Sequence, residues 1–100
     1  MLRISVTDDA HITTVKLEGK VVGPWVEELR ASWLSLATSL GSRALCVDLR
    51  GVSFVDASGK QLLREIYTKN SARFLADTPL TQYFAETAMQ RQGTIEGKGA

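Results

Sequence analysis

The chain has few of the residues that build disulfides and metal sites. It contains one cysteine, Cys46, and one histidine, His11, among 100 residues. A lone cysteine cannot form an internal disulfide, and its place in an apolar run favours a small core residue in a protein of the reducing cytoplasm. One histidine and one cysteine do not supply the several convergent ligands that a metal ion needs. We therefore expect no metal and no cofactor.

Long apolar runs and an excess of charge of one sign are also missing. No segment approaches the roughly 20 apolar residues that span a bilayer. The N-terminus lacks the basic start and the apolar stretch of a secretory signal. The formal net charge is +1, which gives no indication of a basic surface for a polyanion. We expect neither a nucleic-acid partner nor direct insertion into a membrane.

Signatures of catalysis are weak. Gly19 and Gly23 bracket Lys20 without the spacing of a phosphate-binding loop. A triad can be drawn on paper from Ser58, His11 and Asp48, but no glycine-flanked nucleophile elbow supports it. The sequence predicts a protein that is not an enzyme.

What the sequence does contain is a single-domain length with the composition of a globular protein, 44% hydrophobic and 23% charged. Hydrophobic periodicity and turn residues predict an element order of β-β-α-β-α-β-α. The predicted elements are a hairpin (2–6 and 12–17), a helix from Pro24 to a stop at Gly41, a strand (44–49) followed by a short apolar patch (52–55), a helix (59–69), a strand (72–76) and a helix from Pro79. Helices between strands favour parallel pairing of the later strands, with helices on at least one face. The predicted fold class is α/β.

The predicted helices have apolar faces at helical spacing. On the first helix, Trp25, Leu29, Trp33, Leu36 and Leu40 should line that face, with Val26 and Ala37 at its margin. On the last helix, the buried side should consist of Leu80, Tyr83, Phe84 and Ala88. Core packing is a far more common role for such tryptophans than a ligand box.

Ser58 lies where a strand passes into a helix. It follows the apolar patch and Asp56, and it precedes Gly59 and the helical run that contains Leu62 and Leu63. The start of a helix offers free backbone N–H groups and a positive helix end. A phosphate could be placed there, or a partner could bind there. Ser58 or Asp56 could also simply cap the helix, and capping is compatible with either role.

The segment VDLRGVSFVDASGKQLL resembles the motif of STAS domains, the fold of anti-sigma factor antagonists and of sulfate-transporter tails. Asp48-Leu49 matches the end of the motif strand, Phe54 the spacer, and Asp56, Ser58 and Gly59 the loop. The resemblance covers roughly residues 2–90 and implies about four strands and three helices. In phospho-regulated members, the serine before the glycine is modified by a partner anti-sigma kinase. The resemblance assigns that role to Ser58.

The chain departs from the family pattern in three ways. Ala57 replaces the first serine of the usual pair, and Lys60 replaces the usual leucine. The final strand and the longer last helix of many antagonists are missing or reduced. Short STAS proteins of this length also resemble the accessory subunit of bacterial ABC-type lipid transport systems, which docks on the ATPase without phospho-regulation. Two partners therefore stay open, an anti-sigma factor with serine kinase activity and an ABC ATPase.

These observations predict a cytoplasmic regulatory binding module with a STAS-like domain at 1–90 and a flexible tail at 91–100. In either alternative, the binding surface should include the Ser58 loop and the exposed side of the following helix. Its predicted residues are Asp56, Ser58, Gly59, Lys60, Gln61 and Arg64. A homodimer is a further open alternative, because the short C-terminus can leave a hydrophobic face uncovered.

Overall fold

The computed structural model describes residues 1–89 and contains seven regular elements. They are β1 (Leu2–Asp8), β2 (Ile12–Val21), α1 (Pro24–Ala37), β3 (Ala44–Val55), α2 (Ala57–Asn70), β4 (Arg73–Leu75) and α3 (Pro79–Met89). This order confirms the predicted β-β-α-β-α-β-α arrangement. The tail predicted at 91–100 lies outside the described residues.

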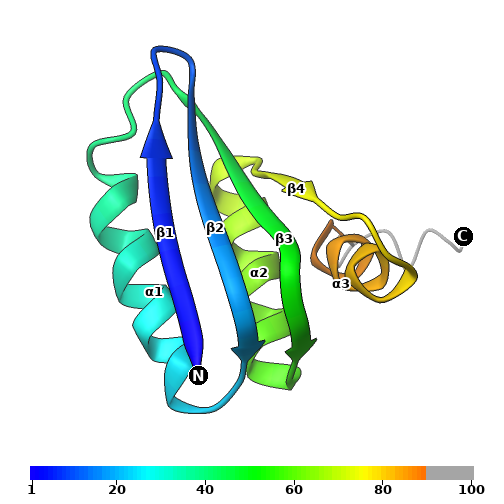
Figure 1. Ribbon diagram of the computed structural model, residues 1–100. Helices are drawn as coiled ribbons and strands as arrows, with labels where there is room; N and C mark the ends of the chain where they lie inside the picture. The colour runs from blue at the N-terminus through cyan, green and yellow to red at the C-terminus, as the bar shows by residue number, and fades with distance from the viewer. Residues whose placement is uncertain (90–100) are drawn as a thin grey trace, which may run out of the picture.

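The strands form one four-stranded sheet in the order β1-β2-β3-β4. β1 and β2 are antiparallel, whereas β2–β3 and β3–β4 are parallel, as the sequence predicts. Figure 1 shows α1 and α2 together on one face of the sheet, with α3 beside the flank formed by β3 and β4. The opposite face of the sheet carries no helix within residues 1–89.

β3 is longer than predicted, because it continues through Gly51 to Val55 instead of ending near Leu49. β2 has ten residues and accompanies β3 to its end, so the backbone groups beyond Gly51 find ladder partners. Two shifts of register absorb the extra residues of β3, between Lys16 and Glu18 and between Gly19 and Lys20. A Cβ at Gly51 would meet Glu18 Cγ at 2.9 Å, so the first bulge brings the strands closer than most side chains allow.

α1 is shorter than predicted and is rotated relative to the expected face. It ends at Ala37, and its buried residues are Val26, Leu29 and Trp33. Val26 therefore lies at the centre of the buried face and not at its margin, while Trp25 and Leu36 are only partly buried. α1 packs against both the sheet and α2, which shifts its buried face toward Val26. The Trp33 indole donates to Asn70 Oδ1 at the end of α2, at 2.7 Å.

α3 buries a different face from the predicted one. Phe84 and Ala88 are buried as expected, together with Thr81 and Ala85. Leu80 and Tyr83 are instead 46% and 51% exposed. The Thr81 hydroxyl accepts hydrogen bonds from the backbone N–H groups of Asp77 and Thr78, at 3.0 Å each. This bonded turn fixes the start of α3 with Thr81 inward, and it leaves apolar side chains on the surface.

None of the helices in residues 1–89 is long and apolar enough to cross a membrane.

Candidate functional site

The start of α2 is held by Asp56. Its Oδ1 accepts from the Gly59 N–H at 2.8 Å, which caps the helix, and its Oδ2 accepts from the Gly23 N–H at 3.0 Å. The Asp56 N–H in turn donates to the Val21 carbonyl at 3.1 Å. The two backbone donors, Gly23 first, lower the pKa of the Asp56 carboxyl. Asp56 therefore joins the β3–α2 junction to the β2–α1 junction, and capping falls to Asp56.

Ser58 is exposed in the first turn of α2, as the second helical residue. Gly59, the next residue, is buried because α2 approaches the sheet there. A Cβ at Gly59 would meet the Val21 carbonyl oxygen at 2.6 Å and Val55 Cγ1 at 2.7 Å. Gly59 therefore packs against the sheet, whereas the adjacent Ser58 faces solvent.

Lys60 connects the Ser58 loop to α3. Its Nζ donates to Tyr83 Oη at 3.3 Å and lies 5.1 Å from the centroid of the Tyr83 ring. This contact lowers the pKa of the Tyr83 phenol. Phe84 packs edge-on against Phe54 at 6.2 Å, and Phe54 is 48% exposed. An aromatic cluster of Phe54, Tyr83 and Phe84, partly open to solvent, therefore lies next to the loop.

Sequence reasoning missed this cluster. It assigned Phe54 to the motif spacer and placed Tyr83 in the core, because both residues suit buried positions in their own segments. Only the packing of α3 against α2 and β3 brings Phe54, Lys60 and Tyr83 together.

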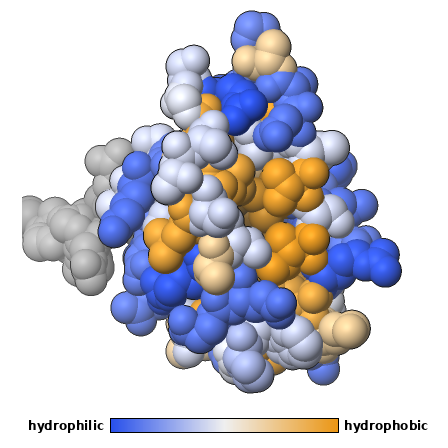
Figure 2. Space-filling view, turned by 90° about the vertical axis from the view of Figure 1, so that its left-hand side faces the viewer, coloured by the Kyte–Doolittle hydropathy of each residue, from blue (hydrophilic) through white to orange (hydrophobic). Residues whose placement is uncertain are grey.

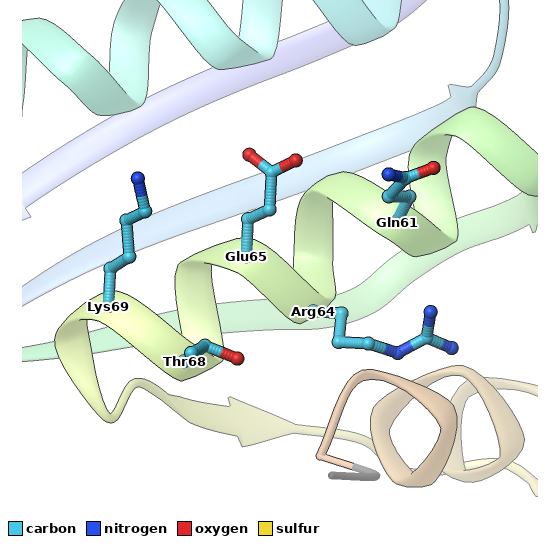
Figure 3. Close-up of a pocket in the computed structure, with 5 residues that line it drawn as sticks. All are labelled: Gln61, Arg64, Glu65, Thr68 and Lys69. Carbon is cyan, nitrogen blue, oxygen red and sulfur yellow. The ribbon is translucent and has the colours of Figure 1, made fainter. Parts of the chain in front are cut away.

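Further along α2, a shallow surface pocket of about 380 Å³ is lined by polar side chains (Figure 3). Its lining residues are Gln61, Arg64, Glu65, Thr68 and Lys69. Glu65 accepts from Arg30 of α1 at 2.8 Å, whereas Arg64 extends toward α3. The Arg64 Nε is buried and has no hydrogen-bond partner within residues 1–89. Gln61 and Arg64, both predicted to bind a partner, therefore line one surface, and Ser58 and Lys60 precede them on the same helix.

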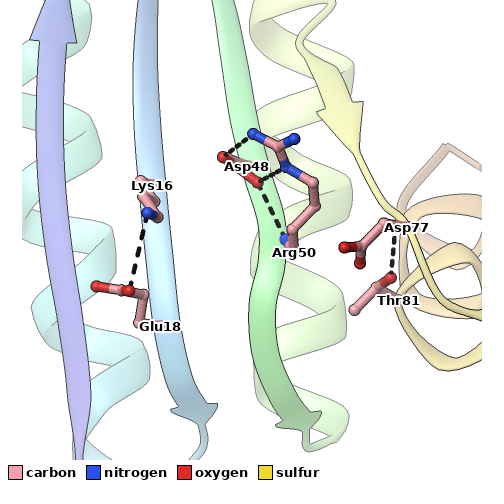
Figure 4. A network of polar contacts seen from close by, with 6 residues as sticks. All are labelled: Lys16, Glu18, Asp48, Arg50, Asp77 and Thr81. Atoms are coloured by element: carbon pink, nitrogen blue, oxygen red, sulfur yellow. Dashed lines mark hydrogen bonds and ion pairs between the residues drawn. The ribbon is translucent and has the colours of Figure 1, made fainter.

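A second polar cluster lies on the helix-free face of the sheet, on β2, β3 and the segment before α3 (Figure 4). Asp48 is buried, and its carboxylate accepts from the Arg50 guanidinium through two bonds of 3.0 Å. The Arg50 side chain lowers the pKa of Asp48. Lys16 and Glu18 pair nearby at 3.8 Å. With Asp77 of the segment before α3, three carboxylates face two cationic side chains here, and Asp48 is already paired with Arg50.

The structure does not bring together the three residues of the hypothetical catalytic triad, Ser58, His11 and Asp48. The His11 carbonyl accepts from the Ala44 N–H where β3 begins, whereas Ser58 follows the end of β3. Twelve strand residues separate these points, which is roughly 35–40 Å of strand. Cys46 is buried, and burial raises the pKa of its thiol. Within residues 1–89, no three His, Cys, Asp or Glu side chains gather as a metal site requires.

Comparisons with known proteins place the fold. No family model and no curated protein matches the sequence. Among solved structures, an anti-sigma factor antagonist from Mycobacterium paratuberculosis superposes with a TM-score of 0.67 at 20% identity, covering 83% of this chain and 74% of that one. SpoIIAA, an anti-sigma factor antagonist in its unphosphorylated form, gives 0.64 at 14% identity, covering 99% and 96%. A STAS domain from Rhodobacter sphaeroides, described as an antisigma-factor antagonist, gives 0.57 at 14% identity, covering 89% and 96%.

The chain therefore has a STAS-like fold, which confirms the predicted architecture. At these identities the likeness concerns the fold, so the role of Ser58 must be argued from the loop itself.

Proposed function

We propose that this protein is a non-enzymatic regulatory binding module of the anti-sigma factor antagonist type, switched by phosphorylation at Ser58. The observation that carries the proposal is that different residues at the start of α2 cap the helix, pack against the sheet and face solvent. Asp56 caps the helix and Gly59 packs against the sheet, so Ser58 is left exposed and has no structural duty that a phosphate would disturb. The folds of the similar solved structures support the same type of module.

The first turn of α2 can accept a phosphate on Ser58. Backbone N–H groups at a helix start and the positive end of the helix favour a negative group of about −1.5 to −2 charges. Lys60 is two residues away, and its ammonium group lies at the surface beside Tyr83. The Asp56 carboxylate, also two residues away, opposes the added charge, but both of its oxygens already accept backbone bonds. The fold should therefore tolerate the modification.

A partner packed over the loop would not tolerate it. The proposed binding surface consists of Ser58, Lys60, Gln61 and Arg64. In the unphosphorylated state, this surface offers cationic side chains next to the exposed ring of Phe54. Phosphorylation would place a doubly charged group inside the interface, at a desolvation and repulsion cost. A loss of about 3 kcal/mol lowers affinity by roughly two orders of magnitude. The partner is accordingly a serine kinase of the anti-sigma factor type, bound in the unphosphorylated state in the cytoplasm.

The test uses the full chain, the cognate kinase and ATP, followed by intact mass measurement. We expect the mass of one added phosphate in the natural protein and none in Ser58→Ala. Ser53→Ala is the matched control, since Ser53 is another exposed serine, five residues earlier on β3. No mass gain, or a gain that persists in Ser58→Ala, contradicts the proposal.

One observation favours a second candidate, the accessory subunit that docks on an ABC ATPase. Phe54, Leu80 and Tyr83 are each about half exposed on the α3 side, so a partner can bind this flank through apolar contact without any phosphate. Capture of binding proteins from the source cell separates the two. A kinase whose binding is abolished by phosphorylation of Ser58 supports the first, and an ABC ATPase that binds Ser58→Asp as well as the natural protein supports the second.

A further inference from the structure

Within residues 1–89, the outer edge of β1 carries backbone hydrogen-bonding groups that pair with no other strand. β1 is the first strand of the sheet, and in the described part of the chain it pairs with β2 alone. The Lys20 N–H donates to the Met1 carbonyl, and the β1–β2 register is regular from Leu2 to Asp8. In an antiparallel ladder, bonded and non-bonded pairs alternate, so the odd-numbered residues of β1 bond to β2. The backbone groups of Leu2, Ile4 and Val6 therefore point away from the sheet.

β1 lacks the features that normally block pairing at a sheet edge. Proteins protect such edges with proline, central charges, bulges or very short strands. β1 has seven residues, no proline and no bulge, and its only charged residues are Arg3 and Asp8, near the two ends. The opposite edge, β4, has only three residues and begins with an exposed arginine, Arg73. The β4 edge is therefore short and carries a charge, whereas the β1 edge has neither protection along its centre.

On the side of the sheet that carries α1, the surface that flanks β1 is apolar, whereas Arg3, Ser5 and Thr7 are exposed on the other side. Val6 is 47% exposed, and Ile4 is partly buried. On α1, Arg30 reaches α2, so residues on the opposite margin of the helix lie toward β1. That margin carries Trp25 and Leu36, both partly buried. Figure 2, which views the molecule from the side of α1 and β1, shows hydrophobic surface running between hydrophilic areas.

We propose that β1 pairs antiparallel with β1 of a second copy of this chain. A two-fold axis normal to the sheet, passing between the two Ser5 residues, would join the two four-stranded sheets into one continuous sheet. In this register Ile4 lies opposite Val6 of the second copy, and Val6 lies opposite Ile4. Both residues carry outward-pointing backbone groups, so each such pair makes two backbone hydrogen bonds across the axis.

The charges of β1 are compatible with this register, and they oppose only larger shifts of the two strands. Arg3 lies opposite Thr7 of the second copy, and Asp8 lies opposite Leu2, so no like charges meet. A shift that placed Arg3 opposite Arg3, or Asp8 opposite Asp8, would bring like charges together and leave Val6 or Ile4 without an apolar partner. The strand is therefore complementary to itself about its centre, which is the requirement for a two-fold interface. This self-complementarity is why a second copy, and not an unrelated strand, is the proposed occupant.

The proposed dimer does not involve the Ser58 surface. Figure 1 shows β1 at one edge of the sheet and α3 beside the other edge, with α2 behind β2 and β3. Antiparallel pairing would place the two Ser58 loops at opposite ends of the joined sheet. Each copy could then bind its own partner, which makes the module bivalent.

The test is sedimentation velocity of the full chain over a concentration series. We expect a concentration-dependent dimer whose dissociation constant rises at least about tenfold in Val6→Lys, because a charge enters the apolar centre of the interface. Leu34→Lys is the matched control, since Leu34 is a similarly exposed leucine on α1, on the margin near Arg30, and it should leave the dimer unchanged.

A second variant, Val6→Pro, tests the backbone contribution. It removes an N–H that points away from β2, so circular dichroism should show the fold retained while the dimer is lost. A chain that stays monomeric at every concentration overturns the proposal. A dimer that persists in a folded Val6→Lys or Val6→Pro variant overturns it equally.

Discussion

The α2–α3 flank and the β1 flank of this domain present different chemical groups to a partner. The α2–α3 flank presents side chains, with Lys60, Gln61 and Arg64 on one helix and the Tyr83 ring beside them. The β1 flank presents a strand edge that is unpaired within residues 1–89, with apolar side chains such as Val6. A helix satisfies its own backbone groups, so its surface can recognise a partner only through side chains, whereas an edge strand carries free donors and acceptors. The first surface suits a partner whose binding phosphorylation can switch, and the second suits another strand of matching shape.

The contrast also concerns how firmly each flank is held. The start of α2 is fixed by Asp56 and by the close approach of Gly59 to β2. The outer side of β1 has no such restraint within residues 1–89. Substitutions on the α2 flank should therefore cost more stability than comparable substitutions on β1. The predictions below test how firmly the start of α2 is held, and whether partner binding depends on the α2 flank and not on β1.

The largest effect is expected for Gly59→Ala. The new Cβ would lie 2.6 Å from the Val21 carbonyl oxygen and 2.7 Å from Val55 Cγ1, so α2 must move away from the sheet. We expect the free energy of unfolding to fall by about 2–3 kcal/mol, measured by chemical denaturation. Ser58→Ala, the adjacent exposed position, should stay within about 0.5 kcal/mol of the natural protein. Equal stability of the two variants would mean that the close approach of α2 has been misjudged.

Asp56→Ala should come next, with a loss of about 1–2 kcal/mol at neutral pH, because the cap of α2 and the bond to Gly23 both disappear. The pKa of Asp56 is lower in the folded state than in the unfolded chain. Its contribution is therefore fully present above about pH 4, the unfolded value, and is lost as the pH falls through the lower folded pKa.

The difference between the natural protein and Asp56→Ala should accordingly shrink when denaturation is repeated near pH 2.5. Glu86→Ala, at an exposed acidic position on α3, should show little difference at either pH. A gap for Asp56→Ala that does not change with pH would exclude the carboxylate as its source.

Arg64→Glu should affect binding more than folding. Reversing this charge on the α2 flank should weaken binding of the proposed kinase partner about tenfold, measured by titration calorimetry, while the melting transition stays cooperative. Arg3→Glu reverses a charge on the β1 flank and should leave the same binding unchanged. Equal losses from both variants would remove the distinction between the two flanks, and a collapsed melting transition in Arg64→Glu would show that the surface is misplaced.

The smallest effect is expected for Lys60→Ala. The contact with Tyr83 is exposed to solvent, so its loss should change the stability of the fold little. The clearer signal is the Tyr83 pKa, which Lys60 lowers and which should rise toward the ordinary value of a tyrosine in the variant. Absorbance titration in a Tyr67→Phe background isolates Tyr83, because these are the two tyrosines of the chain. An unchanged titration would show that Lys60 does not contact the ring in solution.

Sequence patterns predicted the architecture well, because local signals agree with the fold. Alternation in β1, Gly23-Pro24 before α1 and the Asp56–Gly59 loop each place an element correctly. The prediction was wrong where tertiary contacts compete with local signals. Gly51 signals a strand end, but pairing with β2 carries β3 onward. Leu80 and Tyr83 fit an apolar helix face, but the bonded turn at Thr81 rotates α3 so that they face solvent.

The sequence by itself determined the order of elements, the position of Ser58 at a strand–helix junction and the scarcity of catalytic and metal-binding groups. These properties depend on residue type and local spacing, which can be read directly from the sequence. The tertiary structure decided which group caps α2, which aromatic rings surround Lys60 and which strand is left with a free edge. Each of these depends on contacts between residues distant in sequence, such as Gly23 with Asp56 and Lys60 with Tyr83. No local pattern encodes such pairs, because the free energy that selects them comes from packing the whole sheet and its helices at once.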